Sequence, residues 1–125
     1  MTSAVRREHP DGRPRPYAAS VTKNGVVYAC GQVPVAADGS VPAAIGDQVR
    51  LVFDNLERVL EPTGASLATL LKVTVYLADL DEFDDYNEAY LRRLSGLPLP
   101  PRTTVQVARF RGEKRIELEA LASTD

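Results

Sequence analysis

Two segments near the C-terminus carry the residue types that could do chemistry. Pro101-Arg102-Thr103-Thr104-Val105-Gln106-Val107 is followed by Ile116-Glu117-Leu118-Glu119-Ala120. Both alternate polar and apolar residues with the period of two that is typical of a strand. If the two strands lie close together, a fixed cation and a fixed anion face one pocket. Such a pocket suits a small substrate with a carboxylate at one end and a water-sensitive carbon at the other.

Arg102 is the candidate cation. A guanidinium group offers planar, paired donors that match a carboxylate, and it stays charged at any working pH. The backbone N–H groups of Thr103 and Thr104 could add further donors. The alternative interpretation is a surface arginine at the start of a strand, paired with Glu119.

Glu117 and Glu119 are the candidate anions. Separated by one residue on a strand, their side chains point the same way, about 7 Å apart. Solvated carboxylates at a sheet edge are one interpretation. The other is that one of them holds a water molecule and takes its proton as the water attacks an electrophilic carbon. Paired carboxylates also occur in glycosidases, but a short chain without tryptophan is poorly suited to bind a sugar.

Other kinds of catalytic centre are poorly supported. Cys30 and His9 are the only cysteine and the only histidine, so an intrachain disulfide is impossible and the usual structural zinc sites cannot be built. A Ser-His-Asp triad would have to recruit His9, which we expect to be solvated in a polar segment. Cys30 has no histidine near it in sequence, so a small buried thiol is favoured over a nucleophile. The chain contains no phosphate-binding glycine motif.

Length and composition indicate one soluble globular domain. The chain has 125 residues, 44% of them hydrophobic and 26% charged, with a formal net charge of -2. This charge gives no basic footprint for nucleic acid. No apolar run approaches the ~20 residues of a membrane span, and the N-terminal residues lack the apolar core of a signal peptide. We therefore expect a cytoplasmic protein, with a partly ordered leader at residues 1–16 and a single domain at residues 17–125.

Hydrophobic periodicity predicts an α+β fold. Asn24-Gly25 is typical of a tight hairpin turn. Pro62 and Gly64 should end the first helix, and Pro-rich residues 96–101 should follow the second. One sheet with both helices packed on one face fits this order, and the other face would favour association into a ring. The predicted strands cover 17–22, 26–30, 70–77, 102–108 and 115–121, and the helices cover 43–61 and a segment that ends near 94.

The order and spacing of short motifs in this chain resemble the RidA family, also called the YjgF family, of reactive intermediate deaminases. The resemblance runs from about Tyr17 to Ala122. Its motifs are Tyr17-Ala18-Ala19-Ser20-Val21, Asn24-Gly25-Val26-Val27-Tyr28, Gly31-Gln32-Val33-Pro34, Gln48 with Asn55-Leu56 and Val59-Leu60, Gly64-Ala65-Ser66-Leu67, Lys72-Val73-Thr74-Val75-Tyr76-Leu77, Phe83 with Asn87-Glu88-Ala89-Tyr90, and the two C-terminal segments above.

The resemblance implies a chorismate-mutase-like fold and a homotrimer whose three sheets form a central barrel, with sites in the clefts between subunits. It implies hydrolysis of reactive enamines and imines, such as 2-aminoacrylate and 2-iminopropanoate, to the 2-keto acid and ammonia. No metal or organic cofactor is implied. The expected partners are therefore copies of the same chain and small carboxylate-bearing molecules, with neither nucleic acid nor membrane.

The resemblance also implies roles for residues at matching positions, and these roles agree with the interpretation from the residues alone. Arg102 would bind the substrate carboxylate with help from the Thr104 backbone N–H, and Glu117 would position and activate the attacking water. Cys30 stands where many members have serine, so we expect a pocket of different shape. The remaining residues expected to line the pocket are Tyr17, Cys30, Gly31 and Asn87.

Two other functions fit the same residues. One is a regulatory module that binds a keto acid or related metabolite without turnover. The other is a RidA-like enzyme recruited to a biosynthetic pathway, acting on a larger imine.

Overall fold

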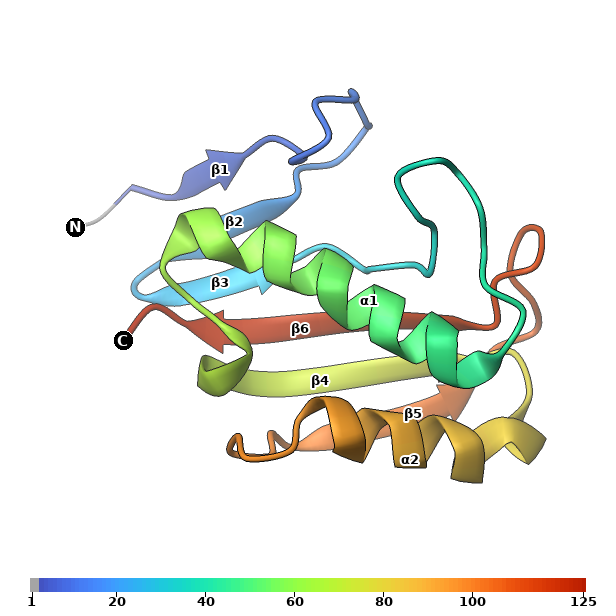
Figure 1. The fold of residues 1–125 in the computed structure, drawn as a ribbon. Coiled ribbons are helices and arrows are strands. Elements are labelled where there is room, and N and C mark those ends of the chain that lie inside the picture. The colour runs from blue at the N-terminus through green and yellow to red at the C-terminus, as the bar shows by residue number, and fades with distance from the viewer. Residues whose placement is uncertain (1–2) are drawn as a thin grey trace.

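The computed structural model describes residues 3–125 as one mixed sheet with two α-helices on one of its faces (Figure 1). The strand order is β1-β2-β3-β6-β4-β5, and every neighbouring pair is antiparallel except β4 and β5, which are parallel. This confirms the predicted layer arrangement. The strands are β1 (Val5–Arg7), β2 (Ser20–Lys23), β3 (Val26–Ala29), β4 (Leu70–Leu77), β5 (Arg102–Gln106) and β6 (Ile116–Ser123).

The helices α1 (Ile45–Leu60) and α2 (Phe83–Arg93) cover the sheet side by side. The apolar stripe of α1 is buried in one core with the alternating apolar residues of β4 and β6, which confirms the predicted helix. On α2, Tyr86 and Tyr90 are buried, whereas Leu91 is 46% exposed. Three short 3-10 helices complete the chain: η1 (Glu61–Thr63), η2 (Leu67–Thr69) and η3 (Leu80–Glu82).

The predicted hairpin between β2 and β3 is confirmed. Asn24 and Gly25 have φ values of 51° and 79°, the left-handed pair that a two-residue turn needs between right-twisted strands. Asn and Gly are the residue types that adopt this conformation at least cost. The turn thus fixes the register of the strand that leads to Cys30 and Gly31.

The N-terminal segment adds a strand that the sequence did not predict. Val5–Arg7 pairs with β2 and forms one edge of the same sheet, so the part of the 1–16 segment that the structure describes is tied to the domain. Met1 and Thr2 of this segment lie outside the described residues. A short, charged edge strand has too few apolar residues to show the alternation of a strand. For this reason the sequence predicted only a partly ordered leader here.

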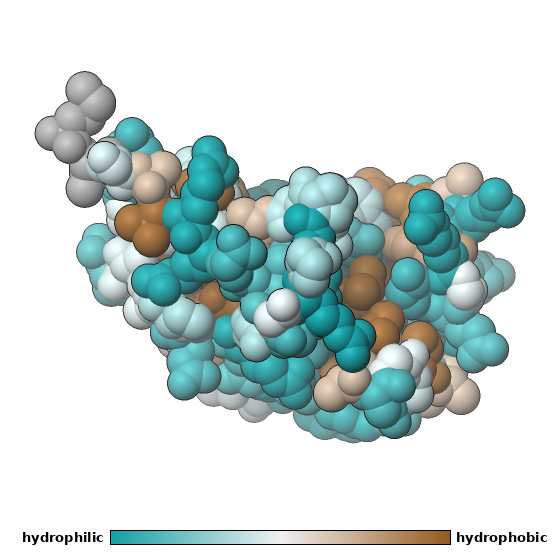
Figure 2. Space-filling view, turned by 90° about the horizontal axis from the view of Figure 1, so that it is seen from above, coloured by the Kyte–Doolittle hydropathy of each residue, from teal (hydrophilic) through white to brown (hydrophobic). Residues whose placement is uncertain are grey.

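The sheet face opposite the helices is open in the single chain. It carries Tyr28, which is 50% exposed, and Val105, which is 40% exposed, beside the two glutamates of β6. Figure 2 shows a different side of the molecule, seen from above and turned by 90° from Figure 1. Most of this side is hydrophilic, and apolar residues show in the hollows between polar ones.

Candidate functional site

Arg102 lies on the helix-covered side of the sheet. It pairs with the buried Val73 at the start of β5, so its side chain points toward α2. Its guanidinium carbon lies 4.6 Å from the ring centroid of Tyr90, 5.2 Å from that of Tyr86 and 5.7 Å from that of Phe83. Three aromatic faces around one cation stabilise its charge and restrict its orientation. These three residues recur at helical spacing on α2, which is why they cluster at one point.

Asn87 orients the same guanidinium group. Arg102 Nη1 donates to Asn87 Oδ1 at 2.7 Å. No carboxylate among residues 3–125 forms an ion pair with Arg102. The alternative pairing with Glu119 is wrong, because Glu119 instead accepts a 2.5 Å hydrogen bond from Tyr76 on the other face. Arg102 is thus a positioned cation with donors left for an anion from outside its own chain.

The tyrosines of this cluster stay neutral. The hydroxyl groups of Tyr86 and Thr104 share a 2.8 Å hydrogen bond, which places the Thr104 side chain beside the Arg102 cluster. Burial raises the pKa of Tyr90 to about 12, and burial also raises the pKa of Tyr86. Neutral rings keep this environment favourable for a cation.

Glu117 lies on the opposite face of the sheet. It pairs with Tyr76 of β4, whose side chain points away from the helices. Its carboxylate rests against the α-carbon of Gly31, and a β-carbon at residue 31 would overlap Glu117 Oε2. Burial and the neighbouring charge of Glu119 raise the pKa of Glu117. A carboxylate with a raised pKa is a better proton acceptor than an ordinary surface glutamate.

Three predicted pocket residues, Tyr17, Cys30 and Gly31, line one cavity of about 430 Å³ between the N-terminal loop and α1. Burial raises the pKa of the Cys30 thiol, and Gln32 Nε2 donates to its sulfur at 3.3 Å. Cys30 is half-buried and not fully buried as expected, and its raised pKa keeps the thiol protonated, which disfavours a nucleophilic role.

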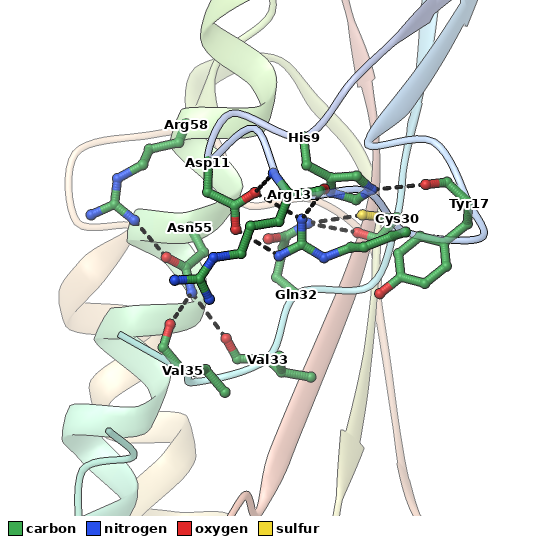
Figure 3. Close-up of polar contacts among 11 residues, drawn as sticks. His9, Asp11, Arg13, Tyr17, Cys30, Gln32, Val33, Val35, Asn55 and Arg58 are labelled. Carbon is green, nitrogen blue, oxygen red and sulfur yellow. Dashed lines mark hydrogen bonds and ion pairs between the residues drawn. The ribbon is translucent and has the colours of Figure 1, made fainter. Parts of the chain in front are cut away.

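His9 has a role that the sequence did not reveal. It is 8% exposed rather than solvated, and its Nε2 donates to the Tyr17 carbonyl at 2.8 Å (Figure 3). Its ring also meets the Tyr17 ring edge to face, with centroids 5.3 Å apart. His9 thus fixes the loop that carries Tyr17. A lone histidine among charged residues gives no periodic signal, so only tertiary structure could show this contact.

The predicted site residues therefore fall into two groups within one chain. Arg102, Asn87 and Thr104 lie on the helix side, whereas Glu117 lies on the open face against Gly31. The condition that β5 and β6 lie close together and face one pocket is not met within one chain, because β4 separates the two strands. Alternation within a strand shows which residues share a face, but it does not show how the faces of two strands correspond.

Comparisons with known proteins find a family and close structural relatives. Residues 11–124 match the family model described as Endoribonuclease L-PSP. The chain is 32% identical over 125 residues to the protein named "Putative reactive intermediate deaminase TdcF" of Escherichia coli (strain K12). This match covers 98% of the chain and 97% of TdcF. It is 38% identical over 112 residues to the mitochondrial protein mmf2 of Schizosaccharomyces pombe, covering 86% and 87% of the two chains.

A solved structure matches the fold over nearly its whole length. The crystal structure of E. coli TdcF with bound serine gives a TM-score of 0.87 at 32% identity, and the match covers 95% of this chain and 98% of that one. Among the residues described here, no helix has the length and apolar character to cross a membrane.

Proposed function

Because this chain belongs to the RidA/YjgF family, we propose that it hydrolyses reactive 2-imino and 2-enamine acids, such as 2-iminopropanoate and 2-aminoacrylate, to 2-keto acids and ammonia. The observation that carries the proposal is Arg102, a guanidinium group oriented by Asn87 and three rings, with no carboxylate partner in the described chain. The bound serine of TdcF, a small molecule with a carboxylate, supports this ligand class.

The reaction needs little beyond orientation and one base. The imine carbon is already electrophilic, so a water molecule held by Glu117 can attack it while the carboxylate takes the proton of the water. Glu117 passes that proton to the nitrogen, which gives a neutral carbinolamine. Glu117 then takes the hydroxyl proton and returns it to the nitrogen as the C=O bond forms and the C–N bond breaks, so the nitrogen leaves as ammonia. The products are the keto acid and ammonia, and Glu117 is again a carboxylate. An enamine must first take a proton at carbon and lose one from nitrogen to become the imine.

We further propose that each site forms between two protomers of a homotrimer. The sheet separates Arg102 from Glu117 within one chain, so one small molecule can contact both only if they come from different copies. The open sheet face, with the exposed Tyr28 and Val105, is available for such contact. A closed ring would place the cation of one copy beside the carboxylate of the next.

The test pairs two inactive variants. With 2-iminopropanoate generated by an amino-acid oxidase, the wild-type protein should speed pyruvate release, and Arg102→Ala or Glu117→Ala alone should remove the acceleration. When the two variants are co-expressed, random assembly should restore both wild-type residues at about one quarter of the interfaces. Activity of the mixture no higher than that of either parent would rule out the shared site.

The same assay separates the deaminase from a binding module. A module that only binds keto acids would be stabilised against heat by pyruvate and would not accelerate hydrolysis. Conversion of a larger imine alone, with no effect on 2-iminopropanoate, would favour a biosynthetic member of the family.

A further inference from the structure

The cavity beside Tyr17 is larger than a small imino acid needs. Its volume is about 430 Å³, and it extends from Tyr17, Cys30 and Gly31 to the side of α1. Apolar side chains of Val33, Val35 and Val59 form part of its lining. The proposed hydrolysis of 2-iminopropanoate makes no use of this extension.

The polar lining of the cavity carries an excess of positive charge. Three arginines, Arg13, Arg15 and Arg58, face a single carboxylate, Asp11, whereas the whole chain has a net charge of -2. Arg15 is neutralised by Asp11 through two hydrogen bonds of 2.9 and 2.7 Å. The paired arginine holds the pKa of Asp11 well below its usual range, so this carboxylate stays charged and remains engaged with Arg15.

Arg13 and Arg58 are the cations left over. Arg58 Nη1 donates to the neutral amide oxygen of Asn55 at 2.6 Å. Neither arginine forms an ion pair with a carboxylate in the part of the chain that the structure describes. Figure 3 shows Arg13 reaching from the N-terminal loop toward Asn55 of α1. An anion in the cavity would therefore meet guanidinium groups from two separate elements.

Hydrogen bonds hold these elements in place. Asn55 Nδ2 donates to the carbonyl groups of Val33 at 2.9 Å and Val35 at 3.2 Å, which ties the segment after β3 to α1 (Figure 3). On the other side, the His9–Tyr17 hydrogen bond fixes the N-terminal loop. The cavity is thus bounded by segments that are anchored before any ligand arrives, which lowers the cost of binding.

We propose that this cavity receives the side chain of the substrate and that the preferred substrates are imino acids whose side chain ends in a second carboxylate. This inference rests on the proposed function, because Tyr17, Cys30 and Gly31 line the cavity while Gly31 also contacts the Glu117 carboxylate. The methylene groups of the side chain would lie on the valines, and the terminal carboxylate would bind Arg13 and Arg58.

Equilibrium binding of keto acids tests the inference without requiring turnover. Calorimetry should show that 2-oxoglutarate, with two carboxylates, binds the wild-type protein about tenfold more tightly than pyruvate, with one. Arg13→Gln combined with Arg58→Gln should remove this preference and leave pyruvate affinity unchanged. Arg50→Gln combined with Arg92→Gln removes the same charge from exposed helix positions and should change neither affinity.

The possible outcomes are distinct. Equal wild-type affinity for the two keto acids, or an equal loss of both in the Arg13/Arg58 variant, overturns the inference. Binding of 2-oxoglutarate that survives Arg102→Ala also overturns it, because the cavity would then be an independent anion site. If the protein hydrolyses no imine but keeps the preference and its loss on substitution, the proposed function fails and the assignment of the cavity stands. Arg13→Gln alone, at an exposed loop position, repeats the test with less risk to the fold.

Discussion

Gly31 and Glu117 are in direct contact, and the contact depends on the missing side chain of the glycine. The carboxyl carbon of Glu117 would lie only 3.0 Å from a β-carbon at residue 31, and Oε2 would overlap it. Gly31 follows the strand that the Asn24-Gly25 turn places, and Glu117 lies on β6. The position of the proposed catalytic base is therefore set by a residue that carries no functional group.

Gly31→Ala should reduce activity strongly and leave the fold intact. The added methyl group meets the end of a flexible side chain, so the Glu117 carboxylate moves aside and the backbone does not have to. A displaced base should lower kcat by about 10- to 100-fold, because catalysis depends on placement within fractions of an ångström. Steady-state kinetics with 2-iminopropanoate and a thermal unfolding curve check both parts. Gly46→Ala is the matched control, since its β-carbon would make only an ordinary 3.8 Å contact with Ala89.

Substitutions of Asn87 should separate orientation from charge at Arg102. Asn87→Ala removes the acceptor that orients the guanidinium and should raise KM about tenfold. Asn87→Asp keeps the shape but places a carboxylate where it pairs with Arg102 and competes with the substrate, so KM should rise further, about 100-fold. Pyruvate binding by calorimetry should follow the same order. A variant with aspartate that binds as well as the wild type would contradict the role of Arg102.

The rate should depend on pH through Glu117. As a base, Glu117 must be ionised, so activity should fall as the pH drops through its raised pKa, at a higher pH than for an ordinary glutamate. Because the charge of Glu119 contributes to this shift, Glu119→Gln should lower the pKa of Glu117 and move the acid limb of the kcat profile to lower pH. Glu88→Gln, on the exposed side of α2, should leave the limb where it is. If the acid limb of the kcat profile stayed at the same pH in the Glu119→Gln variant, a group other than Glu117 would control the rate.

Gln48→Leu should destabilise the protein by about 3 kcal/mol. The Gln48 side chain is fully buried; its Nε2 donates to Pro42 and Glu113 carbonyls, and its Oε1 accepts from the Arg115 backbone N–H at 2.8 Å. Leucine leaves these groups buried without partners. Urea unfolding at a fixed protein concentration measures the loss. Arg50→Ala removes only an exposed ion pair with Asp47 and should change stability by less than about 0.5 kcal/mol.

Local patterns in the sequence predict most of the elements, because each pattern reflects a force that acts within the element. The stripe on α1 and the alternation of β4 each follow from one buried face, and Asn24-Gly25 specifies its turn. The edge strand β1 is too short and too charged to show such a pattern. The order of the strands in the sheet cannot be predicted in this way. No local sequence pattern indicates that β4 lies between β5 and β6.

The candidate site shows the same division. The residue types of Arg102 and Glu117 indicate a cation and a base, and this can be read from the sequence alone. Their placement on opposite faces depends on the register of each strand against β4, where Arg102 meets Val73 and Glu117 meets Tyr76. The contact of His9 with Tyr17 joins residues eight positions apart through a loop without a period, so it too required the structure.

The division of Arg102 and Glu117 between the two sides of one sheet has a consequence for how this protein could be switched on and off. If the proposed shared site is correct, a newly made chain, or one diluted until copies separate, holds halves of two catalytic centres and no complete centre. Once copies dissociate, specific activity should fall with the square of subunit concentration if only closed trimers are active, and in proportion to it if pairs are active. Any agent that covers the open sheet face would silence the chemistry without occupying a substrate pocket.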